Sequence, residues 1–88
     1  MEDQSQPVDV ICVCNADGEL RPLRLRLENG DKQALRVDIE QILQVDKNMC
    51  FGAESISFLC EATLFRRRHR FYMKYSIRSH TWSLLPCI

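Results

Sequence analysis

The stretch that decides the fold covers residues 55–85 and reads SISFLCEATLFRRRHRFYMKYSIRSHTWSLL. It holds two long runs of alternating apolar and polar residues, joined by the basic segment 66–70. Successive side chains of a strand point to opposite faces, so a period of two predicts strands. The stretch therefore predicts a β-hairpin with a charged tip.

Each run of this hairpin gathers apolar residues on one face. These residues are Ile56, Phe58, Cys60, Ala62 and Leu64 in the first run and Phe71, Met73, Tyr75 and Ile77 in the second. One face of the hairpin is thus expected to line a core, with the other face in water.

The preceding part of the chain also predicts strands. Residues 1–7 are expected to be a flexible N-terminal tail and residues 8–88 a single β domain. Residues 8–14 are β-branched and apolar on nearly both faces, as in a central strand, and the turn residues 15–18 end them. A second strand follows from Leu20, with Pro22 at a sheet edge or bulge, and Asn29-Gly30 predicts a tight hairpin turn.

The segment from Asp38 to Val45 is ambiguous. Ile39, Ile42 and Leu43 have helical spacing behind an N-cap candidate, whereas Leu43 and Val45 alternate as in a strand. We expect one helical turn followed by a short strand, and a loop over residues 46–54.

Together these patterns predict an all-β domain, a small SH3-like or partly open β-barrel of about six to seven short strands. The predicted core consists of Val10, Leu23, Leu25, Leu27, Val37, Ile56, Phe58, Leu64, Phe71, Tyr75, Ile77 and Trp82.

Charge is balanced over the chain but not along it. Twelve basic and twelve acidic residues cancel, so the whole molecule has no strong field to attract nucleic acid or an anionic membrane. Residues 1–60 hold six Lys and Arg against eleven Asp and Glu, while residues 61–88 hold six against one. A chain of 88 residues is also too short for a deep substrate cavity.

The five cysteines have no framework spacing, which favours a reducing, cytoplasmic setting. No apolar run approaches the roughly 20 residues of a membrane-spanning helix, so we expect no membrane contact.

The basic hairpin is the candidate site for an anion or nucleic acid, because guanidinium groups match phosphate geometry and an aromatic ring stacks on bases. Its candidate contact residues are Arg66, Arg67, Arg68, Arg70, Tyr72 and Lys74. The alternative is a solvated hairpin tip whose like charges prevent aggregation.

No catalytic or metal motif stands out. Cys12 and Cys14 share a strand face and could pair with His69 or His80 as metal ligands or as a nucleophile and base, but buried apolar thiols and exposed turn histidines explain them better. We expect no enzyme, no metal and no cofactor.

The chain resembles a group of short bacterial proteins of about ninety residues. The likeness rests on residues 17–22 (DGELRP), on residues 37–45 and on the hairpin that leads into Thr81-Trp82-Ser83-Leu84. The resemblance implies a small all-β fold and carries no assigned activity; the long basic tip departs from the shorter turn expected of the group.

Two functions agree with these observations. The first is a non-catalytic interaction module that contacts a protein partner, or a second copy of itself, through a strand edge, aided by the apolar residues 84–88. The alternative is nucleic-acid binding through the basic hairpin around residues 66–74.

Overall fold

The computed structural model describes residues 6–28, 34–50 and 53–85. Over these residues the chain forms seven strands, all paired antiparallel, and no helix, which confirms the all-β prediction. The strands are β1 (Gln6–Cys14), β2 (Leu20–Glu28), β3 (Ala34–Asp38), β4 (Gln41–Cys50), β5 (Ala53–Leu64), β6 (Arg67–Ser76) and β7 (Thr81–Leu85).

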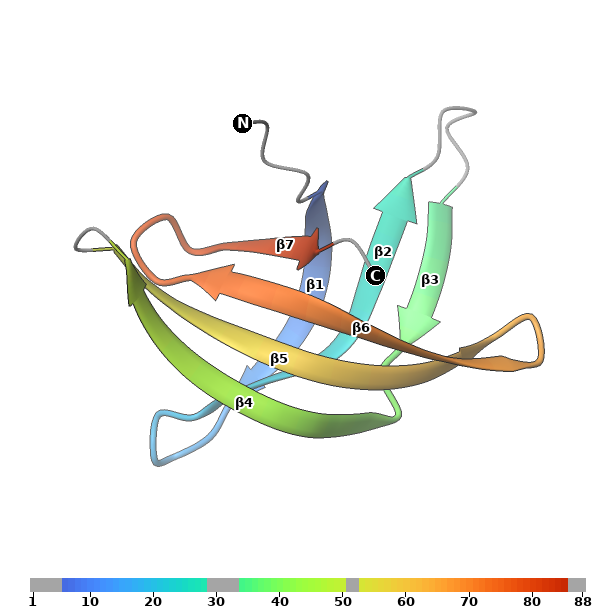
Figure 1. The fold of residues 1–88 in the computed structure, drawn as a ribbon, viewed down its shortest axis with the longest axis horizontal. Coiled ribbons are helices and arrows are strands. Elements are labelled where there is room, and N and C mark those ends of the chain that lie inside the picture. Colours follow the sequence, from blue (N-terminus) through green and yellow to red (C-terminus); the bar gives the residue numbers. More distant parts are fainter. Residues whose placement is uncertain (1–5, 29–33, 51–52, 86–88) are drawn as a thin grey trace.

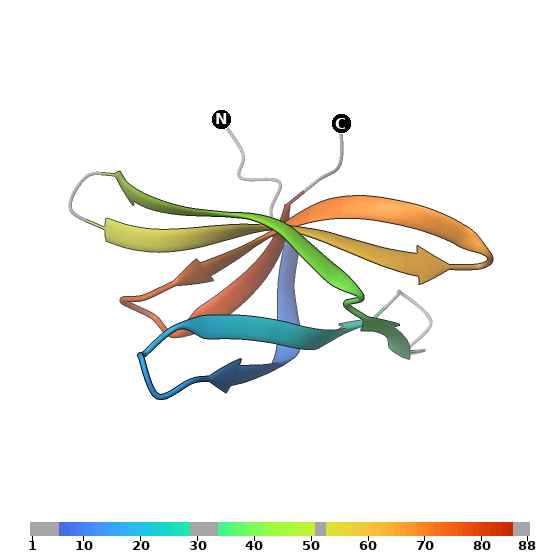
Figure 2. The ribbon, with the colours of Figure 1, turned by 90° about the horizontal axis from the view of Figure 1, so that it is seen from below.

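The strands form one curled sheet in the order β3-β2-β1-β7-β6-β5-β4. β1 links the two halves, because residues 6–8 pair with β7 whereas residues 9–14 pair with β2. Figures 1 and 2 show that β1, β2 and β3 cross over the layer made by β4 to β7. The sheet thus folds back on itself as a half-barrel, in line with the partly open barrel that the alternation predicts.

The core lies between these two layers. Its buried residues are Leu25, Val37, Phe58, Cys60, Ala62, Met73 and Trp82. The ring centroid of Trp82 lies 5.4 Å from that of Phe58 and 5.0 Å from that of Tyr75. Of the predicted core, Leu25, Val37, Phe58 and Trp82 are buried, and others pack partly buried against them: Val10, Leu27, Ile56, Leu64, Phe71 and Tyr75.

The predicted helical turn after Asp38 is wrong. Only Ile39 and Glu40 lie between β3 and β4, and they form a corner. The backbone N–H of Ile39 donates to the carbonyl of Leu23, and that of Glu40 to the carbonyl of Glu61, both at 2.9 Å. The helix-like spacing instead reflects Ile39 and Ile42 packing against the core from the two sides of the corner.

The loop predicted over residues 46–54 is also wrong. β4 runs on to Cys50 and β5 begins at Ala53, with residues 51 and 52 outside the described part of the chain. The polar side chains of Asp46, Lys47 and Asn48 are exposed on this strand. Their loop-like composition therefore reflects the exposure of β4.

Two predicted core residues, Leu23 and Ile77, are exposed by 39% and 38%. Leu23 lies beside the register shift that separates Ile11 from Cys12, where Pro22 is the buried residue. This shift confirms the bulge predicted at Pro22. Ile77 lies in the turn between β6 and β7, where the alternation of the strand ends.

The first turn of the chain, over residues 15–18, agrees with the turn that the sequence predicts there. The turn before β2 contains Gly18 at φ 82°, which a glycine adopts without strain. The Asn29-Gly30 turn lies outside the described residues, although β2 and β3 pair antiparallel on either side of it. Gln6 and Pro7, assigned to the tail from sequence, pair with Leu84 and Ser83 of β7.

Candidate functional site

The tip of the β5–β6 hairpin is tighter than its sequence suggests. The turn consists of Phe65 and Arg66 alone, and the pairing of Leu64 with Arg67 continues up to it. The expectation that residues 66–70 form the apex is therefore wrong. Phe65 and Arg66 have φ of 52° and 65°, the positive values that a two-residue type I′ turn requires.

The strand register divides the six candidate residues among three places. Arg68, Arg70, Tyr72 and Lys74 lie on the outer face of β6, since the residues between them, such as Phe71 and Met73, face the core. Arg67 takes the inner face and Arg66 the turn. The structure thus brings Arg70, Tyr72 and Lys74 together on one outward face, as predicted, and separates Arg66 and Arg67 from them.

A buried carboxylate holds two of these arginines. The Glu61 side chain is only 8% exposed, and its Oε2 accepts a hydrogen bond from Nε of Arg70 at 3.1 Å. Its Oε1 lies 3.7 Å from Nε of Arg68. In the part of the chain that the structure describes, no acidic side chain pairs with Arg66 or Arg67. Among the described candidate residues, positive charge without an acidic partner therefore lies at the turn (Arg66), on the inner face (Arg67) and at Lys74 on the outer face.

Sequence reasoning missed Phe65. Its side chain is 81% exposed at the tip, although it is a large apolar residue. A left-handed backbone costs roughly 1–2 kcal/mol for a residue other than glycine, and such strain clusters at functional positions. The signal was present in the sequence, since Leu64 already fills the inward position and an adjacent apolar residue must point away from the core.

The edge strand β4 is the longest unprotected edge of the sheet. Over the described residues it pairs with β5 on one side and with no strand on the other. It has ten residues, and each described side chain except Ile42 is exposed. Val45 pairs with buried Phe58 and yet is 51% exposed, because no strand covers it.

An apolar groove runs beside this edge. It has a volume of about 380 Å³, and its apolar lining consists of Val13, Leu20, Ile42, Val45 and Phe58. The pairing of β2 with β3 ends at Arg24, and the carbonyl of Leu23 still accepts from Ile39, so among the described residues only residues 20–22 of β2 have no backbone partner on that side. The groove is thus flanked by two unpaired strand segments, one from β2 and one from β4.

The described cysteines and histidines form no reactive cluster. Cys12 and Cys14 are exposed, so the prediction that they are buried thiols is wrong, whereas Cys60 lies in the core as expected. Burial raises the pKa of the Cys60 thiol to about 11. His69 lies in β6 rather than in a turn, and His80 shares a 3.0 Å hydrogen bond with the Tyr75 hydroxyl.

No group of three His, Cys, Asp or Glu residues could hold a metal ion within residues 6–28, 34–50 and 53–85. The same residues contain no helix with the length and hydropathy needed to cross a membrane.

Comparisons with known proteins found no matching family model, curated protein or solved structure. The function is therefore inferred from the surfaces of the domain itself.

Proposed function

We propose that this domain is a protein-interaction module that binds an extended segment of a partner protein along the free edge of β4. The observation that carries the proposal is the ten-residue edge strand with an inward residue, Val45, left half exposed beside an apolar groove. An unpaired edge offers backbone donors and acceptors to an added strand, and pockets for alternate side chains supply specificity.

The groove explains why an added strand gains more than backbone hydrogen bonds. Every second side chain of such a strand would point toward the core side, over Val45 and across from Val13 and Leu20. Burial of apolar surface stabilises by roughly 25 cal/mol per Å². The partner segment would act as the missing strand between β4 and the start of β2.

The bulge in β4 limits the length of the segment. The register of β4 with β5 shifts between Ile42 and Gln44, after which the pairing is regular from Gln44 to Cys50. Bulges interrupt pairing on an edge. We therefore expect a partner strand of about seven residues, matching this regular part.

The variant Val45→Lys tests the proposal, because an inward-pointing charge on an edge strand opposes strand addition. The matched control is Ile11→Lys, which places the same charge at an equally exposed apolar position of β1. We expect at least a tenfold weaker affinity for a partner captured from cell extract in the first variant and no change in the second.

Amide hydrogen exchange locates the contact. Slower exchange in residues 44–50 on complex formation is the expected result. Equal retention of the partner by Val45→Lys, or protection confined to other strands, would contradict the use of this edge.

Self-association is one form of the same contact, with a second copy supplying the added strand. Sedimentation of the purified protein tests this form directly: a concentration-dependent dimer that Val45→Lys converts to monomer supports it. A monomer at all concentrations leaves a separate protein as the partner.

A second candidate function is nucleic-acid binding on the outer face of β6. It is favoured by Arg70, Tyr72 and Lys74 lying in one row, with Tyr72 exposed by 44%. Opposed to it is Glu61, whose carboxylate neutralises charge in that row. The test is a salt titration with single-stranded RNA and DNA, in which Glu61→Gln should tighten binding and Tyr72→Ala should weaken it. No binding at low salt would eliminate this function.

A further inference from the structure

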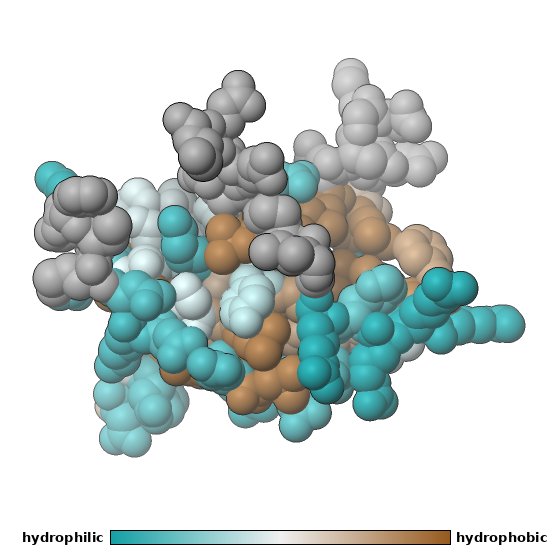
Figure 3. All heavy atoms as spheres, in the orientation of Figure 1, coloured by the Kyte–Doolittle hydropathy of each residue, from teal (hydrophilic) through white to brown (hydrophobic). Residues whose placement is uncertain are grey.

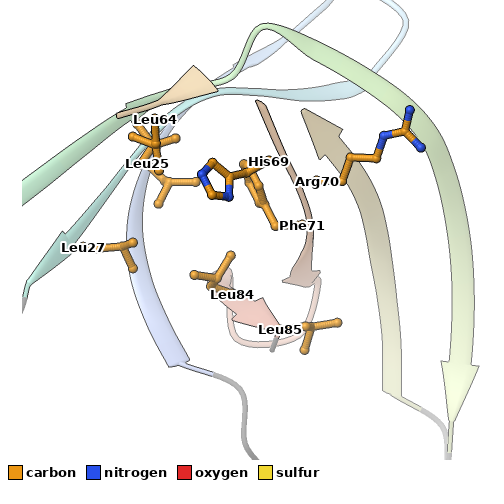
Figure 4. Close-up of a pocket in the computed structure, with 9 residues that line it drawn as sticks. Leu25, Leu27, Leu64, His69, Arg70, Phe71, Leu84 and Leu85 are labelled. Carbon is orange, nitrogen blue, oxygen red and sulfur yellow. The ribbon is translucent and has the colours of Figure 1, made fainter. Parts of the chain in front are cut away.

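The opposite end of the half-barrel holds a second apolar cavity of about 240 Å³. Its lining comes from β2, β3, β5, β6 and β7 and includes Leu25, Leu64, His69, Phe71 and Leu84. Figure 4 shows His69 and Leu84 directed into the cavity and Arg70 directed to the opposite side of β6. Pockets for small molecules run from roughly 300 to 1,000 Å³, so this cavity suits a single apolar side chain.

Within the described residues, β7 covers only part of β6 beside the cavity. The last described pair is Leu85 with Tyr72, and β6 runs on for five more residues to Arg67. Over the described residues this part of β6 pairs only with β5. A strand laid here would continue the line of β7 and direct alternate side chains toward the cavity.

Two basic residues, Arg66 and Arg67, lie at the hairpin end of the cavity. Arg67 pairs with Leu64, which lines the cavity, and Arg66 adjoins it in the turn, neither with an acidic partner among the described residues. Glu61 belongs to the other face of β5 and is held by Arg68 and Arg70. In Figure 3 the hydrophilic tip side chains lie beside an apolar area of the surface. A partner that contacts Arg66 and Arg67 and fills the cavity would combine negative charge with apolar side chains.

The turn adds an independent observation. Asn-Gly suits a type I′ turn best, yet this turn holds Phe65 and Arg66, both left-handed. Phenylalanine and arginine are both enriched in the buried centre of protein interfaces. The turn therefore has a strained backbone and exposes side chains of the type that contact partners.

We propose that this end of the β5–β6 hairpin is a docking site for an acidic, extended segment of a partner protein, which pairs with residues 67–71 and inserts one large apolar side chain into the cavity. The site is separate from the edge of β4, so it goes beyond the function proposed above. It also assigns a role to Arg66, Arg67 and Phe65 that does not involve nucleic acid.

Synthetic peptides test the proposal on the full chain. The probe is the alternating peptide Ac-ELELELELE-amide carrying a fluorophore. Ac-ESESESESE-amide lacks the apolar side chains and Ac-KLKLKLKLK-amide lacks the acidic ones, so these two peptides are the controls. We expect saturable binding of the first peptide alone, measured by fluorescence anisotropy, with an affinity that falls as salt is raised.

Matched variants locate the binding. The double variant Arg66→Glu and Arg67→Glu should lower the affinity at least tenfold, whereas Arg78→Glu, an exposed arginine in the β6–β7 turn, should leave it unchanged. Leu27→Phe narrows the cavity and should also abolish binding, whereas Val13→Phe enlarges a residue of the groove beside β4 and should not. Circular dichroism confirms that each variant is folded.

The turn supplies the sharpest variant. Phe65→Asn with Arg66→Gly should raise the melting temperature, because it removes left-handed strain, while weakening the peptide. A purely structural turn would gain stability with no loss of affinity, and that result would count against the proposal.

Three further outcomes would overturn it: equal binding of the acidic and basic peptides, binding that survives both Leu27→Phe and the arginine variant, and binding that appears only after residues 86–88 are deleted. The last outcome would assign the cavity to the C-terminal residues of the chain itself. Because Val45→Lys leaves this end untouched, failure here and failure at the edge of β4 are distinguishable.

Discussion

The two edges of the sheet, β3 and β4, differ in how far the chain covers them. β3 has five residues, and its inward residue Val37 is 2% exposed because β5 packs over it across the corner. β4 is twice as long, and its inward residue Val45 is 51% exposed. The strands carry similar apolar residues, so the difference comes from the second layer and not from composition.

The corner between the edges explains this difference. Ile39 and Glu40 tie the end of β3 to β2 and to β5, which brings the two layers together at one point. Beyond that point β4 diverges from β2 and leaves the groove that lies between them. A half-barrel closed at one corner thus buries Val37 on one edge strand and leaves Val45 on the other edge strand exposed.

The largest expected effect on stability distinguishes exposed β4 from its neighbour β5. Phe58→Asp should abolish folding, because Phe58 is 1% exposed against Trp82 and an unpaired buried carboxylate costs several kcal/mol against a total stability of about 5–15 kcal/mol. Its neighbour variant Val45→Asp should remain folded. Circular dichroism melts measure both, and a cooperative melt of Phe58→Asp near that of the parent would contradict the assigned face.

Cys60 gives the next largest effect, through pH. Its pKa is raised to about 11 in the folded state by burial, from 9.0 in its unperturbed state. The folded protein therefore holds this proton more tightly, and the stability it confers is complete below pH 9 and is lost as pH rises toward 11. The expected loss is on the order of 3 kcal/mol.

Urea titrations at several pH values measure this loss, with Cys60→Ala as the reference for other titrating groups. The parent should lose more stability than the variant between pH 9 and 11. Parallel curves would show that the thiol ionises as freely in the folded chain as in the unfolded one. Thiol reagents provide a second reading, since exposed Cys12 and Cys14 should react before Cys60.

Much of the fold could be predicted from the sequence. The parts that could not be predicted failed for physical reasons. Alternation identified the inward faces of β5 and β6 and the core residues Leu25, Val37, Phe58 and Trp82. It could not place β4, because the polar residues of a strand exposed along its length resemble those of a loop. Leu23 and Ile77 failed because a bulge and a turn break the period of two locally.

The candidate site was only partly accessible to sequence reasoning. The row of Arg70, Tyr72 and Lys74 follows from strand alternation alone. The pairing of Glu61 with Arg68 and Arg70 depends on the register of the hairpin. The sequence did not give this register, because the two-residue turn lacks the Asn or Gly that would have marked it. The groove and the cavity depend on how two layers cross, which no local pattern contains.

A smaller effect is expected at Glu61, whose carbonyl accepts a backbone bond of the corner. Glu61→Gln should cost about 1 kcal/mol, because it weakens charge-assisted hydrogen bonds whose arginine partners remain hydrated. Glu54→Gln, an exposed glutamate of the same strand, is the control. A loss above about 3 kcal/mol, the range for a broken buried ion pair, would mean that the carboxylate also holds the corner that separates the edges.

The smallest effect tests whether charge contributes to the protection of β3. Asp38 forms an ion pair with Nε of Arg24 on β2, and the two side chains are 67% and 41% exposed. Exposed pairs contribute about 0–1 kcal/mol, so Asp38→Asn should change stability little and should lose even that effect in high salt. Asp9→Asn, which breaks the similar pair with Arg26, should match it. The contrary result is that Asp38→Asn alone strongly destabilises the domain and makes the β3 amides exchange rapidly. In that case this ion pair would hold β3 in place, and the corner bonds would not explain why Val37 of β3 is buried and Val45 of β4 is exposed.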